Sequence, residues 1–181
     1  MRKLAYILVA TALLGNTARA EDNPVESYLA LSAAEAIPDL SVLREFPAVF
    51  ERLEAENLKQ RVEAAYASTI FFNDTLVTLT SRDELVDYLA QSGEKTNHLA
   101  IRIVDVATSG ENVYVRWQME MSFDVMGTER KSNSVGMTHL RFDRSGKIIL
   151  HQDFWDSAGG FYQTLPVVGR VIRWVKNGLH P

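Results

Sequence analysis

Hydrophobic residues near the start of the chain's patterned region recur every three to four positions, which is the spacing of one helix face. One such stripe lies at 49–53, just after Pro47, a residue favoured in the first turn of a helix. A second stripe follows at 58–65, and Asn57 with Gln60 resembles a capping box at its start. The pattern therefore predicts two helices rather than one continuous rod.

A third helix is predicted after a short strand. The strand covers 70–72 and ends at the polar pair Asn73-Asp74. Ser81 and Glu84 then form a clearer capping box, which indicates where the helix begins. The helical stripe behind this box is expected to end near Gly93.

The period then changes to two, which is typical of strands. Apolar residues alternate with polar ones at 99–103, along a long strand at 113–125, and again at 132–142. A last strand follows the polar turn Asp143–Gly146. Four successive strands joined by short turns predict an antiparallel meander. Helices followed by a meander predict an α+β domain in which helices cover one face of a sheet.

The last strand carries the chemistry of greatest interest. His151, Asp153 and Trp155 are spaced by two residues, so their side chains project from one face. If that face points inward, Asp153 could act as an acid or base with a raised pKa, assisted by His151. Alternatively, Asp153 accepts hydrogen bonds from a Trp or Tyr and only organises the interior. Asp156 is expected to cap the turn that follows.

Several of these segments together resemble a known family. They are Tyr66-Ala67 at the end of a helix, the strand end FFND, the helix opened by Ser81, the VRW strand, and GMTHLRFDRSGKIILHQDFWD. Over roughly Val49 to Leu179 the chain resembles the SnoaL-like branch of the nuclear transport factor 2-like superfamily, which includes ketosteroid isomerases and limonene epoxide hydrolases. The resemblance implies a cone-shaped α+β domain, with a curved antiparallel sheet wrapped on N-terminal helices and a C-terminal helix.

The resemblance also assigns roles to individual residues. Asp74 matches the position of the isomerase general base, and Asp153 is placed like a catalytic aspartate of the epoxide hydrolases. Thr138 stands where both enzymes have a second carboxylic acid. This departure favours a module that binds a small apolar or amphipathic molecule. The alternative is an isomerase or epoxide-hydrolase-like enzyme that uses Asp153 with His151 and Asp74.

The same resemblance places a ligand cavity between the sheet and the helices. The residues expected to wall it are Tyr66, Phe72, Trp117, Met119, Thr138, Leu140 and Trp155. Such an aromatic and methionine stripe also suits a plain hydrophobic core. No cofactor is expected. His139, His151 and Asp153 lack the spacing typical of a zinc site, so no metal is expected either.

The first twenty residues have the pattern of a cleavable signal peptide. Arg2 and Lys3 precede a short apolar run, and Ala18-Arg19-Ala20 is a small-x-small cleavage site. We therefore expect a signal peptide (1–20), a loosely structured leader (21–46) and a SnoaL-like domain (47–181). The chain has no cysteine, which suits export to a bacterial periplasm without disulfides.

The distribution of charge limits the partners. The formal charge is −4 and would become −7 after loss of Arg2, Lys3 and Arg19, which argues against a nucleic-acid binder. Against this balance, 167–179 combines an apolar stripe with three basic residues. This segment could contact a membrane surface, making the protein a membrane-peripheral or assembly partner. Packing of the stripe on the sheet or on a partner subunit is favoured, and a homodimer is expected from the resemblance.

Overall fold

The structure is a computed structural model, which describes residues 43, 45–50, 52–53 and 56–179. The expected signal peptide lies outside the described residues, as does nearly all of the expected leader, so both stay predictions. The first described helix, α2 (Glu45–Phe50), begins two residues before the domain boundary expected at 47.

The two predicted N-terminal helices are present. Pro47 lies in the first turn of α2, where its missing N–H leaves no hydrogen bond unmade. Asn57 is the N-cap of α3 (Leu58–Ala65), but its side chain makes no capping hydrogen bond, so the expected capping box at this helix is wrong. The backbone carbonyl of Asn57 instead accepts the first helical hydrogen bond, from Arg61 N at 3.1 Å.

The third predicted helix, α4 (Arg82–Lys95), begins as its sequence indicates. Ser81 Oγ accepts from Glu84 N, and the Glu84 carboxylate accepts from the Ser81 backbone N–H, which completes the capping box. Such a cap stabilises a helix by about 1 kcal/mol. The helix continues two residues beyond Gly93, which is buried against the rest of the domain rather than ending the helix.

Six strands form one curved sheet in the order β2-β1-β6-β5-β4-β3. Their bounds are β1 (Tyr66–Asn73), β2 (Thr78–Ser81), β3 (Thr96–Ser109), β4 (Asn112–Val125), β5 (Thr128–Phe142) and β6 (Ile148–Trp155). The predicted antiparallel meander is β3 to β6. Two features were not expected from the sequence: the short strand β2, and the parallel pairing of β1 with β6.

The turn between β5 and β6 is built by Asp143 as its sequence indicates. One carboxylate oxygen of Asp143 accepts from Ser145 N at 2.8 Å and from Lys147 N at 2.9 Å. Gly146 has a φ of 80°, in the left-handed region that only glycine adopts without strain. This turn sets the register of the strand that carries His151 and Asp153.

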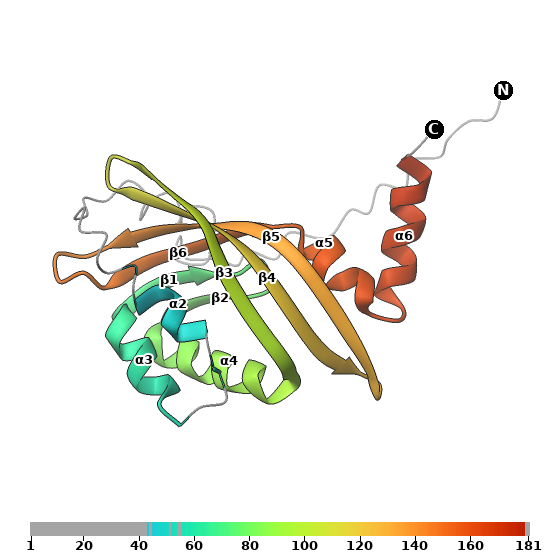
Figure 1. Cartoon of the computed structure of the whole chain (residues 1–181), viewed down its shortest axis with the longest axis horizontal. Helices are drawn as coiled ribbons and strands as arrows, with labels where there is room; N and C mark the ends of the chain where they lie inside the picture. Colours follow the sequence, from blue (N-terminus) through green and yellow to red (C-terminus); the bar gives the residue numbers. More distant parts are fainter. Residues whose placement is uncertain (1–42, 44, 51, 54–55, 180–181) are drawn as a thin grey trace, which may run out of the picture.

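The elements form two layers, which confirms the expected α+β class (Figure 1). Helices α2, α3 and α4 all lie on one side of the curved sheet (Figure 1). The core between them is made of apolar side chains from both layers, which are all nearly inaccessible to solvent: Val49, Leu58, Val62, Tyr66, Phe72, Leu85, Val113, Val115, Leu140, Phe142 and Ile148. The helices thus cover only part of the inner sheet face.

After β6 the chain forms α5 (Ser157–Gly160), the 3-10 helix η3 (Tyr162–Thr164) and α6 (Val168–Leu179). Asp156 caps α5 by accepting from Gly159 N at 2.8 Å, as predicted. The apolar stripe of α6 does not pack on the sheet, because most of its residues are exposed. Its packing on a partner subunit stays a prediction. None of the described helices is long and apolar enough to cross a membrane.

Candidate functional site

A pocket of about 550 Å³ opens between the helices and the inner face of the sheet. Its walls are mainly apolar and aromatic. They come from α2, α4, five strands and the segment around η3, and include Phe46, Phe50, Phe72, Tyr88, Leu89, Leu99, Ile101, Trp117, Met119, Met121, Phe123, Trp155, Phe161 and Leu165. The size is in the range of about 300–1,000 Å³ that small-molecule sites occupy.

Strand β6 supplies the polar end of this pocket. His151, Asp153 and Trp155 all line it, as their two-residue spacing predicts. The side chain of His151 is 2% exposed and that of Asp153 is 15% exposed. At this end of the pocket, the Asp153 carboxylate therefore lies beside a buried imidazole, within a largely apolar wall.

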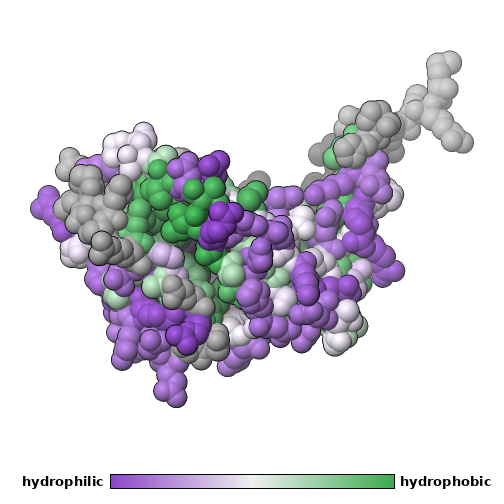
Figure 2. All heavy atoms as spheres, viewed as in Figure 1, coloured by the Kyte–Doolittle hydropathy of each residue, from purple (hydrophilic) through white to green (hydrophobic). Residues whose placement is uncertain are grey.

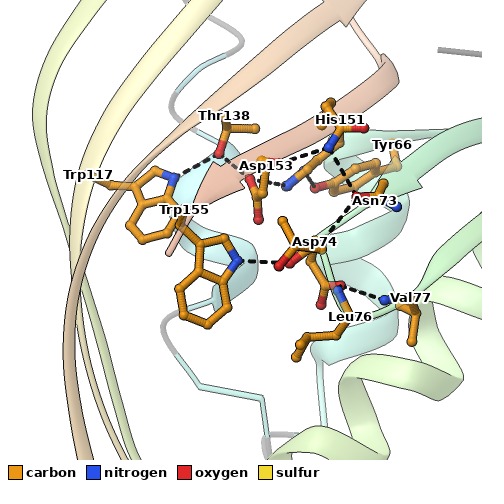
Figure 3. Close-up of polar contacts among 12 residues, drawn as sticks. Tyr66, Asn73, Asp74, Leu76, Val77, Trp117, Thr138, His151, Asp153 and Trp155 are labelled. Atoms are coloured by element: carbon orange, nitrogen blue, oxygen red, sulfur yellow. Dashed lines mark hydrogen bonds and ion pairs between the residues drawn. The ribbon is translucent and has the colours of Figure 1, made fainter. Parts of the chain in front are cut away.

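A chain of hydrogen bonds connects five side chains from four strands (Figure 3). Tyr66 Oη and His151 Nδ1 are 2.8 Å apart, and His151 Nε2 and Asp153 Oδ1 are 3.0 Å apart. From the other side, Trp117 Nε1 donates to Thr138 Oγ1 at 2.8 Å, and Thr138 Oγ1 donates to Asp153 Oδ1 at 2.5 Å. Both branches therefore end on the same oxygen of Asp153.

One arrangement of hydrogens satisfies every member of this chain. Tyr66 is fully buried, and burial, with the nearby Asp153 charge, raises its pKa well above 10, so its hydroxyl keeps its hydrogen. That hydrogen needs an acceptor, and His151 Nδ1 is in place to accept it. His151 then carries its own hydrogen on Nε2 and donates it to Asp153. Tyr66 thus fixes the tautomer and orientation of His151.

The other oxygen of Asp153, Oδ2, accepts no hydrogen bond from the residues that the structure describes. Thr138 cannot serve a ligand as a donor, because its single hydroxyl hydrogen goes to Asp153. Trp117 likewise spends its only N–H on Thr138. Among the five side chains joined by these hydrogen bonds, Asp153 Oδ2 is therefore the group that remains for a ligand.

Asp74 also lines the pocket, but it is fully engaged in holding the structure. Its Oδ1 accepts from Leu76 N and from Val77 N, both at 2.9 Å. Its Oδ2 accepts from the hydroxyl of Tyr88, whose pKa is raised by burial and by this carboxylate. The backbone carbonyl of Asp74 accepts from Trp155 Nε1 at 2.9 Å. Asp74 therefore anchors the wall of the pocket.

The remaining residues expected in the pocket divide into two groups. Phe72, Trp117, Met119 and Thr138 line it, as expected. Tyr66 and Leu140 do not line it: Tyr66 lies behind His151, and Leu140 packs in the core although it pairs directly with His151 across the strands. The inner face at Leu140 is covered by core side chains, so it is closed to a ligand.

Sequence reasoning missed several wall residues. Phe46 and Phe50 contact His151, with ring centroids 5.6 and 6.2 Å away. Tyr88 lies on the apolar stripe of α4, and its spacing predicts only helix packing. Phe161 packs against Phe123 at 5.4 Å and brings the C-terminal segment to the pocket. In the sequence these aromatic residues have only the spacing of buried side chains, which does not distinguish the wall of a pocket from the hydrophobic core.

The polar groups around the pocket do not form a metal centre. Within the described residues, no group of three or more His, Cys, Asp or Glu side chains could hold a metal ion. His139 lies on the opposite face of β5 from Thr138 and bonds Asn112 Oδ1 at 2.8 Å. It is therefore separated from His151 and Asp153 by the sheet.

The fold and the pocket define a class of small α+β proteins in which a curved sheet and helices enclose an apolar pocket with few polar groups. The chain belongs to the SnoaL-like domain family, whose model matches residues 46–151. This confirms the family that the sequence resembles. No curated protein matches the chain.

Solved structures share the fold at low sequence identity. A protein with a ketosteroid isomerase-like fold from Catenulispora acidiphila DSM 44928, in complex with trimethylamine, is 17% identical with a TM-score of 0.57, covering 70% of this chain and 95% of that one. A protein described as a SnoaL-like polyketide cyclase from Shewanella denitrificans OS-217 is 16% identical with a TM-score of 0.56, covering 67% and 94%. An LEH-like epoxide hydrolase of M. tuberculosis is 16% identical with a TM-score of 0.53, covering 75% and 96%. These likenesses show the fold and leave the reaction open.

Proposed function

We propose that this protein binds a small, largely apolar molecule in its pocket and holds one polar group of that molecule against Asp153. The observation that carries the proposal is a carboxylate oxygen, Asp153 Oδ2, without a hydrogen-bond partner among the described residues, in a pocket of about 550 Å³ with aromatic walls. The Asp153 side chain is 15% exposed, so this oxygen can be reached from the pocket, and a ligand donor would give it a hydrogen bond inside a largely apolar wall.

The chemistry of the pocket limits the ligand. The group that meets Asp153 Oδ2 must donate a hydrogen bond, because a carboxylate oxygen accepts hydrogen bonds and has no hydrogen to give. An alcohol, a phenol or a protonated amine meets this requirement. Trp117 and Trp155, whose ring centroids are 6.5 Å apart, offer faces that also suit a cationic amine. Trimethylamine, bound by the relative from Catenulispora acidiphila, is one probe of this kind.

A second candidate function is proton transfer with Asp153 as the acid or base. It is favoured by the orientation of the carboxylate, which His151 and Thr138 fix from two sides while Oδ2 faces the ligand space. Binding remains the first proposal because two expected partners are engaged elsewhere. Both carboxylate oxygens of Asp74 already accept hydrogen bonds from the protein, and Thr138 has no free hydrogen for an oxyanion.

Native mass spectrometry of gently purified protein is the first test. Release of an additional few hundred daltons on denaturation would support the pocket ligand and supply it for identification. Asp153→Asn should then weaken affinity for that ligand by about 10- to 100-fold. The asparagine can place its NH2 group where Oδ2 was, and this group cannot accept the hydrogen bond that the ligand donates. Asp124→Asn is the matched control, because Asp124 lines the pocket but is exposed.

The two functions give different results in the same variant. Binding alone is supported if the affinity falls in Asp153→Asn and no product forms with the unmodified protein. Proton transfer is supported if Asp153→Asn binds nearly as well but forms no product. Equal affinity and equal turnover in the unmodified protein and in both variants would refute both proposals. Thermal unfolding of each variant shows that the comparison is made between folded proteins.

Export and dimerisation are also proposals. The periplasmic location is supported by the signal-like residues 1–20, and it fails if the mature protein still begins at Met1. The homodimer is supported by exposed apolar residues on the outer sheet face, where Met137 pairs with Phe154 and Val135 lies two residues away. A monomeric mass in light scattering at all concentrations would refute the dimer.

A further inference from the structure

Helix α6 presents an apolar side that nothing in the described chain covers. Trp174 and Leu179 are 76% and 77% exposed, and Val171 is 56% exposed. Val168 and Val175 are also exposed, and they lie three and four residues from Val171, on the same side of the helix. The helix stands at the end of the molecule away from α3 and α4 (Figure 1). The side of α6 turned to the viewer in Figure 2 is mainly hydrophilic, so the helix is strongly two-sided.

The domain fixes which side of α6 faces outward. Gly169 is buried against η3, where a Cβ atom would lie 2.2 Å from the backbone oxygen of Gln163. Arg173 Nη1 donates to the same oxygen at 2.9 Å, and Lys176 Nζ lies 3.5 Å from Asp156. These contacts hold the side with Gly169 and Lys176 toward the domain, whereas Arg170 and the rest of the Arg173 side chain are exposed. The apolar side is therefore directed away from it.

The charge of α6 is opposite to that of the whole protein. The helix carries Arg170, Arg173 and Lys176 and no acidic residue, whereas the chain has a formal charge of −4. A surface that attracts this helix would be anionic and would accept apolar side chains. An anionic lipid surface has both properties, and a helix with basic residues on one side and Trp and aliphatic residues on the other is suited to lie in it.

A second copy of α6 is a poorer occupant of this apolar side. A helix of 12 residues is about 18 Å long and about 10 Å wide. One side of such a helix is small against the roughly 800 Å² per partner that a specific protein interface buries. A lipid surface needs no shape complementarity and supplies the opposite charge.

We propose that α6 docks the protein on an anionic lipid surface, with Val168, Val171, Trp174, Val175 and Leu179 in the interface. The exposed Arg170 and Arg173 attract the helix to the charged headgroups, and the domain with its pocket stays on the water side. This inference concerns a different surface from the pocket, so its test is independent of the ligand.

Vesicle binding of the full chain tests the proposal. The protein should sediment with vesicles of phosphatidylcholine and phosphatidylglycerol, and its tryptophan emission should shift to shorter wavelength. Trp174→Phe should remove most of this shift, because Trp117 and Trp155 already lie in the pocket wall. Arg170→Gln should weaken binding about fivefold at low salt, whereas Lys59→Gln, an exposed cation on α3, should leave it unchanged.

The double variant Val171→Glu with Val175→Glu should lose vesicle binding. Both side chains are exposed, so the domain should keep its thermal transition. Trp174→Ala gives the same test with no added charge. The proposal is wrong if the unmodified protein ignores anionic vesicles, or if the double variant binds them equally well. It is also wrong if α6 instead supports a concentration-dependent dimer that the double variant abolishes.

Discussion

Thr138 is the residue whose replacement tests the hydrogen-bond chain most directly. Its hydroxyl accepts from Trp117 Nε1 at 2.8 Å and donates to Asp153 Oδ1 at 2.5 Å, and the residue is 1% exposed. Thr138→Val removes the hydroxyl and keeps the branched shape, so it changes hydrogen bonding with little change in packing. The substitution therefore tests the contribution of the hydrogen bonds to stability separately from the contribution of the apolar wall around them.

The expected loss of stability follows from these two bonds. A hydrogen bond to a charged group contributes about 1.5–3 kcal/mol, and a buried donor without an acceptor costs about 1–3 kcal/mol. Asp153 keeps its bond from His151, while Trp117 Nε1 loses its acceptor. We expect the free energy of unfolding to fall by about 4 kcal/mol. With a urea dependence of about 2 kcal/mol per molar, the midpoint should fall by about 2 M.

Urea unfolding followed by circular dichroism measures this shift, with two controls. Thr138→Ser keeps the hydroxyl and should lose only about 1 kcal/mol, for the missing methyl group. Thr108→Val removes a hydroxyl from an exposed residue of β3 and should change the free energy of unfolding by less than about 0.5 kcal/mol. If Thr138→Val unfolds at the same midpoint as Thr138→Ser, the hydroxyl is not holding Trp117 and Asp153 as inferred.

Two further predictions concern packing and pH. Gly136→Ala should destabilise the domain by about 1–3 kcal/mol and move Trp117 from the pocket wall, because the added Cβ would lie 2.4 Å from Trp117 Cη2. Unchanged stability and unchanged tryptophan emission would refute this prediction. Burial, and secondarily Arg141, lower the pKa of His139 from 6.5 to about 4. Between these values the unfolded chain binds more protons than the folded one, so the contribution of His139 is full above pH 6.5 and is lost as the pH falls to about 4. His139→Gln should reduce this pH dependence in urea titrations at several pH values, and an unchanged dependence would contradict the assignment.

Local sequence patterns determined most of the elements of this fold. The change of hydrophobic period from about 3.6 to 2 separates the helices from the meander, because each period follows from the geometry of one element alone. The Ser81 capping box and the Asp143 turn are equally local, and both form as predicted. Alternation along β6 also placed His151, Asp153 and Trp155 on one face. The Asn57 box failed because the residue types of a cap permit its hydrogen bond without requiring it.

The arrangement of the site was decided by contacts between distant segments. Parallel pairing of β1 with β6 brings Tyr66 to His151 across 85 positions, and the register of β5 on β6 puts Thr138 beside Asp153. Tyr88, on α4, donates a hydrogen bond to Asp74, which directly follows β1. Strand alternation gives the face of a side chain, but only the packing of the layers decides whether that face is core, as at Leu140, or open pocket, as at Asp153. The stripe of α6 could likewise be read from the sequence, whereas its exposure depends on how Gly169 and η3 seat the helix at the edge of the domain.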